Sequence, residues 1–385
     1  MMNTQWLAFT NQIKEYYKKD FVPLHEPTFN SKELEYVKDC IETGWVSSVG
    51  AYVTRFEEDL ARFTGVKRAV AVMNGTAALH IALKVAGVQE NEEVFMPALT
   101  FIATANAASY LGAAPHFVDV SEKTLGIDPQ KLEKHILKIS DVRGNQLFNK
   151  ETGRVIRAVV PMHTFGHPVE IEELQLICTK YHLVLVEDAA ESLGSYYKGK
   201  HTGSFGKVSA LSFNGNKIIT TGGGGAILTD DEELANYAKH ITTTAKVPHR
   251  WEYEHDEIGF NYRLPNINAA LGCAQLEKIP HFIKQKRKLT AFYEELVAPL
   301  EGVTLFKEPE DSTSNYWLQT LVLDDILKRD EVLTFLNESG IMSRPIWTPM
   351  HELKLYAQMP KADLSITEKL NQKIINIPST PVREV

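Results

Sequence analysis

The sequence is poor in cysteine. Only three occur among 385 residues, Cys40, Cys178 and Cys273, and they are widely spaced without a CxxC pair. Disulfide-rich folds and sulfur-ligated metal sites need more cysteines at closer spacing. The spacing therefore predicts no metal site, and it indicates buried, reduced thiols in a cytoplasmic protein.

The chain also lacks an excess of positive charge and any long apolar run. Its formal net charge is −8, which argues against nucleic-acid binding because that needs a basic surface. No stretch approaches the roughly 20 apolar residues that span a bilayer, and the N-terminus has no basic segment followed by an apolar one. We therefore expect a cytoplasmic protein with neither nucleic-acid nor membrane partners. A small anionic ligand is still allowed, since helix N-termini bind phosphate inside acidic proteins.

Strand-like and helix-like patterns alternate through the first 230 residues. Two of the predicted strands, 155–160 and 183–186, are almost wholly apolar, as strands covered on both faces are. This alternation predicts an α/β fold with a mostly parallel sheet flanked by helices. After about residue 245 the chain changes to polar, aromatic and mixed segments that favour a smaller α+β domain. We therefore predict a large domain over residues 1–245 and a small C-terminal domain over residues 246–385.

An aspartate and a lysine carry the main chemical signal. Asp188 ends an apolar strand, and Lys217 follows the predicted strand 208–213 and precedes four glycines, 222–225. A lysine amine can hold an aldehyde cofactor as a Schiff base, and an ionised aspartate can keep a pyridine nitrogen protonated. The pair is typical of a pyridoxal phosphate (PLP) site. Taken singly, Asp188 is better explained as a helix N-cap and Lys217 as a solvated loop lysine.

Two further segments support that interpretation. Asn74-Gly75-Thr76 follows a strand and opens a helix, where free N–H groups and the helix dipole favour a phosphate. Ser212 and Asn214 could add donors to the same phosphate. Four consecutive glycines inside a core domain favour close contact with a cofactor or with the backbone of a partner.

These pieces occur in the order of one known family. The chain resembles the DegT/DnrJ/EryC1/StrS sugar aminotransferases, fold-type-I PLP enzymes that act on nucleotide-linked keto sugars, from about residue 27 to about residue 378. The resemblance implies a seven-stranded, mostly parallel sheet flanked by helices, a smaller α+β domain, and a homodimer with shared active sites. The motifs that carry it are Asn74-Gly75-Thr76-Ala77-Ala78-Leu79, Pro161-Met162-His163-Thr164-Phe165-Gly166, Glu187-Asp188-Ala189-Ala190, the lysine segment and Gly259-Phe260-Asn261-Tyr262-Arg263.

The resemblance also implies roles around the cofactor ring. Lys217 would be the Schiff-base lysine and proton shuttle, and Asp188 would pair with the pyridinium. Phe101 would stack on one face of the ring. His163 would lie near the ring, although a structural histidine at a strand end explains it almost equally well.

The phosphate would be held by two groups of residues. Gly75, Thr76 and Ser212 would bind it from one subunit. Asn261 would reach the phosphate of the neighbouring subunit's cofactor, which makes the dimer part of the active site.

One position departs from the family pattern. Residue 191 is commonly glutamine in the family and is glutamate here. A glutamine can donate a hydrogen bond to the phenolate oxygen of the cofactor, whereas an ionised carboxylate can only accept. Either burial raises the pKa of Glu191 and keeps it protonated, or its side chain turns elsewhere.

Substrate contacts are predicted for a few cationic residues. A guanidinium binds diphosphates and carboxylates bidentately, so Arg263 and Arg344 are candidates, with Arg250 as a third. A surface ion pair is the alternative explanation for each arginine. His351, in the segment 344–351, is predicted to contact the substrate as well.

The predicted reaction is transamination of a nucleotide sugar. L-glutamate would give its amino group to C4 of a nucleoside-diphosphate 4-keto-6-deoxy sugar, with UDP-2-acetamido-4-keto-2,4,6-trideoxyhexose as the main prediction. The alternative substrate is GDP-4-keto-6-deoxymannose, which would make the enzyme a perosamine synthase. A related PLP-dependent sugar dehydratase is disfavoured because those relatives carry histidine in place of Lys217. A non-catalytic sensor would need an additional DNA-binding module.

Overall fold

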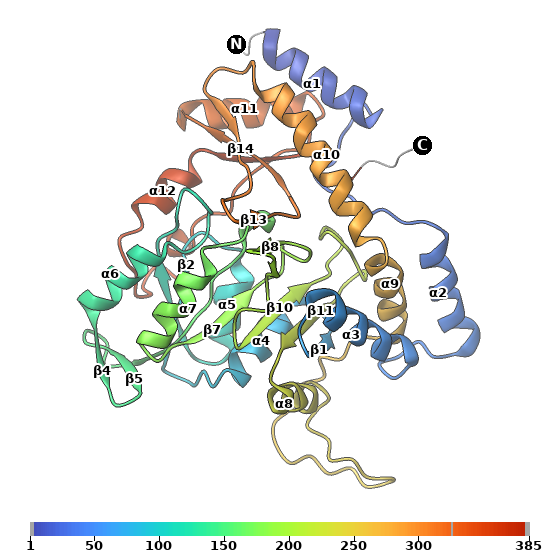
Figure 1. The fold of residues 1–385 in the computed structure, drawn as a ribbon, viewed down its shortest axis with the longest axis vertical. Helices are drawn as coiled ribbons and strands as arrows, with labels where there is room; N and C mark the ends of the chain where they lie inside the picture. Colours follow the sequence, from blue (N-terminus) through green and yellow to red (C-terminus); the bar gives the residue numbers. More distant parts are fainter. Residues whose placement is uncertain (1–3, 325, 382–385) are drawn as a thin grey trace.

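A large mixed sheet with helices on both faces dominates the structure (Figure 1), a computed structural model that describes residues 4–324 and 326–381. Along the main path of the sheet, four neighbouring strand pairs are parallel, and one strand, β11 (Gly225–Thr229), runs antiparallel to both of its neighbours. The hairpin of β4 (Ser140–Arg143) and β5 (Gln146–Asn149) extends the sheet beside β6. The main path runs through seven strands in the order β1 (Arg68–Val72), β11 (Gly225–Thr229), β10 (Val208–Ser212), β7 (Val184–Asp188), β6 (Val155–Val159), β2 (Glu93–Pro97) and β3 (Ala114–Val118). The predicted mostly parallel sheet is confirmed, with the predicted seven strands along its main path and the β4–β5 hairpin as two further strands.

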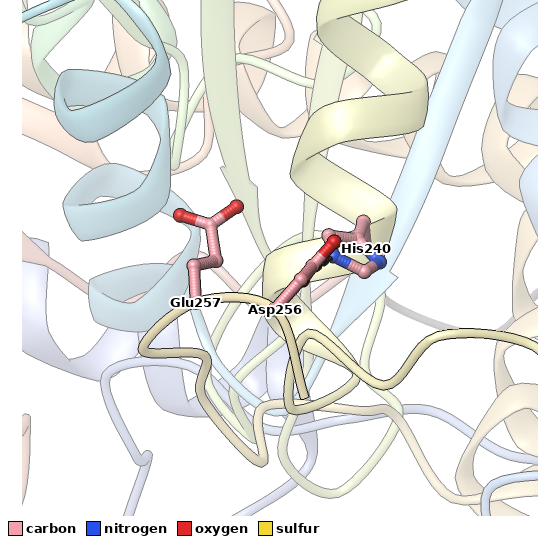
Figure 2. Close-up of side chains that lie close together, drawn as sticks. All are labelled: His240, Asp256 and Glu257. Carbon is pink, nitrogen blue, oxygen red and sulfur yellow. Dashed lines mark hydrogen bonds and ion pairs between the residues drawn. The ribbon is translucent and has the colours of Figure 1, made fainter. Parts of the chain in front are cut away.

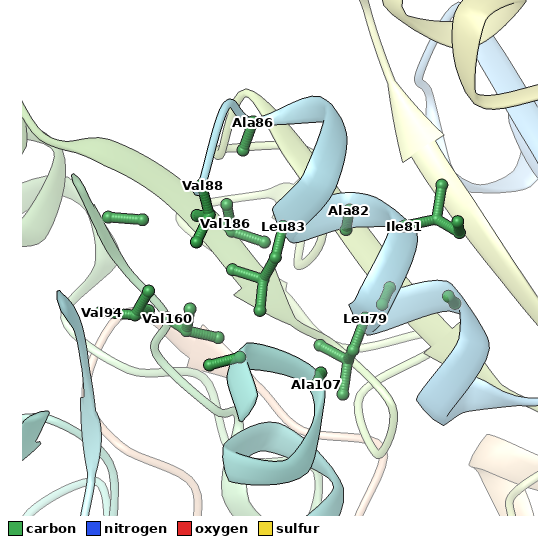
Figure 3. Close-up of a cluster of buried hydrophobic side chains, with 14 of the residues drawn as sticks. Leu79, Ile81, Ala82, Leu83, Ala86, Val88, Val94, Ala107, Val160 and Val186 are labelled. Atoms are coloured by element: carbon green, nitrogen blue, oxygen red, sulfur yellow. The ribbon is translucent and has the colours of Figure 1, made fainter. Parts of the chain in front are cut away.

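Alternating side chains divide the core into a layer on each face of this sheet. On β1, Val70 and Val72 face the layer formed by α4 (Gly75–Val85), α5 (Ile102–Tyr110) and α8 (Glu232–Thr242). Figure 3 shows part of this layer. Ala69 and Ala71 face the opposite layer, which contains α3 (Ala51–Thr64) and α9 (Asn266–Leu276). Further along the sheet, α6 (Pro129–Ile139) and α7 (Ile171–Lys180) cover that same face.

Local sequence signals explain where several helices begin. Asn30 and Glu33 form a capping box at the start of α2 (Ser31–Thr43), and Asp128 caps α6 just before a proline at the first helical position. The apolar side chains of α2 are only partly buried, because Cys40 is buried whereas Leu34 and Ile41 are exposed.

The C-terminal part forms a second sheet, in the order β12 (Val303–Leu305), β14 (Gln319–Leu323), β16 (Ile374–Ile377) and β15 (Arg344–Pro345). Helices α10 (Ile279–Val297) and α11 (Ile326–Glu338) pack on it, and so does α1 (Thr4–Tyr17) from the other end of the chain. In that core, Phe9 and Ile13 of α1 lie with Leu321 and Ile375. The division of the chain at residue 245 stays a prediction.

Short elements connect the two parts. A three-stranded sheet pairs β13 (Ser312–Thr313) with β8 (Tyr196–Tyr197), which also pairs with β9 (Lys200–His201). The remaining elements are the 3-10 helices η1 (Thr164–Gly166) and η2 (Met350–Glu352) and the helix α12 (Ser365–Asn371). Among the described helices, none is long and apolar enough to cross a membrane.

Part of the glycine run 222–225 lies where another segment of the backbone leaves no room for a side chain. A Cβ atom on Gly225 would lie 2.5 Å from the carbonyl oxygen of Asn74 and 2.8 Å from that of Leu211. Gly222 has a φ of +80°, a conformation that favours glycine. Gly223, in contrast, has no atom within 4 Å of a built Cβ. In this structure the close neighbour of Gly225 is therefore the turn that opens α4.

We predict that Gly225→Ala destabilises the fold while Gly223→Ala does not. The added methyl group of Gly225→Ala meets backbone atoms, so strand β11 or the α4 turn must shift, at a cost of about 1–3 kcal/mol. Gly223→Ala should stay within about 0.5 kcal/mol of wild type. Urea unfolding of both variants measures the difference, and equal midpoints would contradict the packing described.

Candidate active site

One cavity brings most of the predicted site residues together. It has a volume of about 300 Å³ and lies at the carboxyl ends of the strands, where open α/β sheets place their ligands. The predicted residues that line it are Gly75, Thr76, Phe101, Asp188, Glu191, Ser212, Asn214 and Lys217. A cavity of similar volume beside α6, lined by Lys131, Lys134 and His135 among others, contains none of them.

The N-terminus of α4 forms one end of the cavity. The Asn74 side chain accepts the N–H of Ala77 at 2.8 Å, and no described residue accepts a hydrogen bond from the N–H of Gly75 or Thr76. A Cβ atom on Gly75 would lie 2.7 Å from the Ser212 Cβ, so glycine lets the helix start approach the Ser212 hydroxyl. Two free N–H groups, a hydroxyl and the helix dipole fit a phosphate.

Asp188 places a buried carboxylate in the same cavity. Its Oδ2 accepts the Thr104 hydroxyl at 2.6 Å, and its Oδ1 accepts the N–H of Ala190 at 3.2 Å. Burial raises the pKa of Asp188, and these two hydrogen bonds oppose that effect. No cation in the described ranges forms an ion pair with it, so the site fits the protonated ring nitrogen of a pyridine cofactor.

Lys217 lies in the loop between β10 and β11, with its amine at the cavity wall. The Nζ atom is 3.1 Å from Glu191 Oε1 and 3.8 Å from the centre of the Trp317 ring. The loop is fixed by the Lys217 N–H, which donates to the Asn214 carbonyl at 3.0 Å, and by Trp317 Nε1, which donates to the Asn216 carbonyl at 2.7 Å. The amine is therefore held between a carboxylate and an aromatic face.

Glu191 points at the lysine and is almost fully buried. Its side chain is 1% exposed, and its Oε2 accepts the N–H of Phe165 at 2.9 Å. Burial raises the pKa of Glu191 to about 7, although the positive charge of Lys217 opposes the rise. The sequence left open whether this carboxyl is protonated or turned elsewhere. In the structure it faces Lys217 with a raised pKa.

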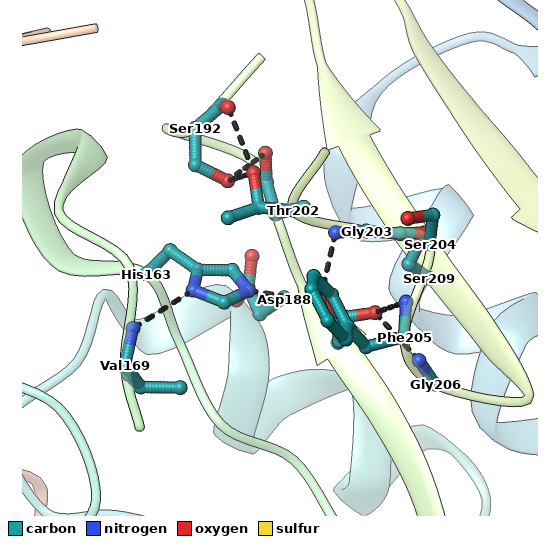
Figure 4. A network of polar contacts seen from close by, with 12 residues as sticks. His163, Val169, Asp188, Ser192, Thr202, Gly203, Ser204, Phe205, Gly206 and Ser209 are labelled. Carbon is teal, nitrogen blue, oxygen red and sulfur yellow. Dashed lines mark hydrogen bonds and ion pairs between the residues drawn. The ribbon is translucent and has the colours of Figure 1, made fainter. Parts of the chain in front are cut away.

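His163 is engaged away from the cavity. Its Nε2 is 3.0 Å from Glu187 Oε2, and its Nδ1 accepts the N–H of Val169 at 3.3 Å. Figure 4 shows the ring between Val169 and strand β7. Both ring nitrogens therefore have protein partners, the arrangement of the structural alternative, and a contact between His163 and the cofactor stays a prediction.

Four other predicted residues lie outside this cavity. Asn261 is exposed, and its side-chain oxygen accepts two hydrogen bonds from Arg263. Arg344 is exposed on β15. His351 is buried in η2, where its Nε2 is 3.2 Å from Glu368 Oε1. None of the four lines the cavity of its own chain.

One group of potential metal ligands occurs among the described residues. His240, Asp256 and Glu257 offer ligand atoms within 4.8 Å of one another (Figure 2). His240 Nε2 is 2.7 Å from Asp256 Oδ1, and both acids are exposed. The contact is that of a surface ion pair, away from the cavity.

Two residues of the site were missed from the sequence. Thr104 binds Asp188, and Trp317 packs on Lys217. Thr104 is the third residue of α5, three positions after the predicted ring-stacking residue Phe101. This closeness in sequence was a usable signal. Trp317 lies just before β14, which begins at Gln319.

The comparison with protein families decides the classification. The model described as the DegT/DnrJ/EryC1/StrS aminotransferase family matches residues 27–383. The chain belongs to this family. Lys217 and Asp188 line the cavity, and their roles as the reactive lysine and aspartate stay a prediction.

Individual relatives agree with the family. The chain is 37% identical over 361 residues to the GDP-perosamine synthase of Escherichia coli O157:H7, covering 94% of both proteins. It is 38% identical over 333 residues to EpsN of Bacillus subtilis, provisionally named a pyridoxal phosphate-dependent aminotransferase, covering 86% of this chain and 83% of the relative. The solved structure of Helicobacter pylori PseC, an aminotransferase involved in pseudoaminic acid biosynthesis, superposes with a TM-score of 0.84 at 26% identity over 93% of both chains.

These matches confirm the predicted fold and enzyme class. The chain is a PLP-dependent aminotransferase, and its relatives place it among the sugar aminotransferases.

We predict that Glu191→Gln changes how the stability of the cofactor-free enzyme depends on pH. In wild type the pKa of about 7 lies above the ordinary 4.5. The protonated carboxyl therefore makes its full favourable contribution to the free energy of unfolding below pH 4.5, and this contribution is lost as the pH rises through 7. The difference, 7 − 4.5, corresponds to up to about 3 kcal/mol. Glutamine does not ionise, so the variant should gain up to that amount relative to wild type between pH 5 and pH 8.

Urea unfolding at the two pH values tests this expectation. Glu172→Gln serves as the control, because Glu172 forms an exposed ion pair with Lys198 and should show no such gain. Parallel stability curves for wild type and Glu191→Gln would show that the carboxyl ionises normally.

Proposed function

We propose that this enzyme transfers the amino group of L-glutamate to C4 of a nucleoside-diphosphate 4-keto-6-deoxy sugar. One observation carries the proposal. A single cavity joins the amine of Lys217, the buried carboxylate of Asp188 and the free N–H groups that begin α4. These groups match the aldehyde, the ring nitrogen and the phosphate of PLP, respectively.

When bound, PLP supplies an electron-withdrawing ring that stabilises negative charge on the carbon next to the amino group. The residues of the chain do the remaining work. Asp188 keeps a proton on the ring nitrogen, and the N–H groups of Gly75 and Thr76 bind the phosphate with the Ser212 hydroxyl. Lys217 moves a proton between carbon atoms, since its amine reaches the cavity from the loop after β10.

The favoured sugar is GDP-4-keto-6-deoxymannose. The Escherichia coli relative, at 37% identity over nearly the whole of both chains, is named GDP-perosamine synthase. That name supports the alternative considered from the sequence over the UDP-linked 2-acetamido sugar that was its main prediction. The coarser assignment, a sugar aminotransferase, does not depend on this choice.

We also propose a cytoplasmic homodimer with shared active sites. Asn261 and Arg263 belong to a family motif yet lie outside the cavity of their own chain, which suits a role in the site of a partner. Three large apolar side chains in the segment before Asn261 are exposed, those of Trp251, Tyr253 and Ile258. Such exposed apolar side chains support a surface that a partner subunit would bury. The three cysteines are free and buried, as suits a reducing compartment.

We predict that Lys217→Ala abolishes both cofactor attachment and turnover. Wild type loaded with PLP should show a visible absorbance band that L-glutamate removes. Lys217→Ala should lack that band and lose at least about 1,000-fold in kcat, because no other amine replaces the proton carrier. Lys207→Ala, an exposed lysine, should behave as wild type. An active Lys217→Ala enzyme would overturn the mechanism.

We predict a preference for the GDP-sugar. With L-glutamate as donor, kcat/KM for GDP-4-keto-6-deoxymannose should exceed that for UDP- and dTDP-linked 4-keto sugars by about tenfold or more. Product analysis by mass spectrometry measures each rate. A higher kcat/KM for the UDP-sugar would contradict the proposed preference for GDP but not the proposed amination of a 4-keto sugar.

A further inference from the structure

Glu191 and Trp317 surround the free amine of Lys217. We propose that Glu191 is a second proton-carrying residue of this active site, which takes a proton from the Lys217 ammonium while Trp317 keeps the amine within reach. The inference rests on the proposed function, because it assumes that Lys217 is the reacting lysine.

The geometry gives Glu191 one atom for this task. Its Oε2 is occupied by the N–H of Phe165 at 2.9 Å, so Oε1 is the atom that faces Lys217 Nζ, at 3.1 Å. The lysine side chain is 13% exposed and the glutamate 1%, which leaves little water to exchange protons with either group. The Trp317 ring lies 3.8 Å from Nζ, and an aromatic face attracts a cation at that distance.

Such a partner assists the reaction because the lysine must change its protonation state. Only the neutral amine can accept a proton from substrate or attack a carbonyl carbon. The ammonium of Lys217 can give one proton to the Glu191 carboxylate along their hydrogen bond. The pair then becomes a neutral amine and a carboxylic acid, with no other reactant consumed. A glutamine amide cannot take up that proton.

The proton affinity of Glu191 suits this exchange. Burial raises the pKa of Glu191 to about 7, and a proton carrier works best when its pKa is near the working pH. The neighbouring charges are those of Lys217, which lowers the pKa of Glu191, and Asp188, which raises it. Among the described residues, Glu191 is the only carboxylate that forms an ion pair with Lys217.

Groups beyond this pair do not compete for the proton. His163 is hydrogen-bonded to Glu187. Burial, together with the charges of Lys286 and Lys217, keeps the pKa of His25 well below its ordinary value. Lys286 lies behind Trp317 and donates to backbone carbonyls, those of Trp317 at 2.8 Å and Ser379 at 2.6 Å.

A buried segment positions both members of the pair. The Asn315 side chain donates to the Glu191 carbonyl at 2.9 Å and accepts the N–H of Trp317 at 2.8 Å. Trp317 Nε1 in turn donates to the Asn216 carbonyl, next to the lysine. Tyr316, between them, has a φ of +48°, and Phe165 has a φ of +56°. Such conformations are strained for aromatic residues and persist where the surroundings impose them.

The test is a pH titration of the visible band of the PLP-loaded enzyme. A nearby carboxylate favours the protonated form of the lysine nitrogen, so Glu191→Gln should lower the midpoint by about one pH unit or more. Its kcat should fall by about 10- to 100-fold, with the KM for L-glutamate within about twofold of wild type, and the limb of the kcat profile near pH 7 should disappear. Glu191→Asp, which keeps the charge, should restore the midpoint at least in part.

Further variants separate positioning from general damage. Trp317→Leu should lower the midpoint in the same direction, and Trp317→Phe should recover it because an aromatic face is retained. Glu172→Gln, the exposed control, should match wild type. If Glu191→Gln does not fold, the Glu191→Asp and Trp317 variants still decide the question.

Two outcomes distinguish the proposals. A wild-type midpoint and an unchanged kcat profile in Glu191→Gln would overturn the role of Glu191 and leave the aminotransferase mechanism intact. A wild-type enzyme with no visible band would reject the proposed function itself.

Discussion

The parallel pairing of β7 with β10 is the contact on which the site depends. Its register sets Ala210 opposite Asp188, so Ser212 and the lysine loop emerge at the edge of the sheet where Asp188 ends its strand. Strand β11 then returns antiparallel, with Gly225 opposite both Ser212 and Val72. That pairing brings the turn at Gly75 to the same edge. A slip of one residue in any of these pairs would turn the site side chains to the other face of the sheet.

The arrangement of strands around the site could be predicted because the sequence signals that determine it are local. Apolar runs indicate buried strands, and the turn residues at Gly75 and the cap at Asn74 are encoded within a few positions. The carboxyl ends of parallel strands lie at one edge of the sheet, independently of the conformation of the loops between them. Gly75, Asp188, Ser212 and Lys217 were accordingly expected together, and they line one cavity.

The segment 314–318 could not be predicted in the same way. Its apolar residues continue into β14, so a pattern-based prediction begins the strand at Trp317. The role of the segment comes from hydrogen bonds to Glu191, Leu193 and Asn216, each about 100 or more positions away in sequence. The proton affinity of Glu191 has the same origin. Burial by distant segments raises its pKa, and no property of the neighbouring sequence reports that burial.

The size of the cavity bears on where the sugar is recognised. At about 300 Å³ it lies at the lower end of the range for pockets that enclose one small ligand. PLP would occupy most of it, so the proposed nucleotide-sugar substrate would extend beyond this cavity. Arg344 is exposed on β15, and Asn261 and Arg263 lie outside the cavity of their own chain. In the proposed homodimer, we therefore expect residues of two chains to recognise the nucleotide.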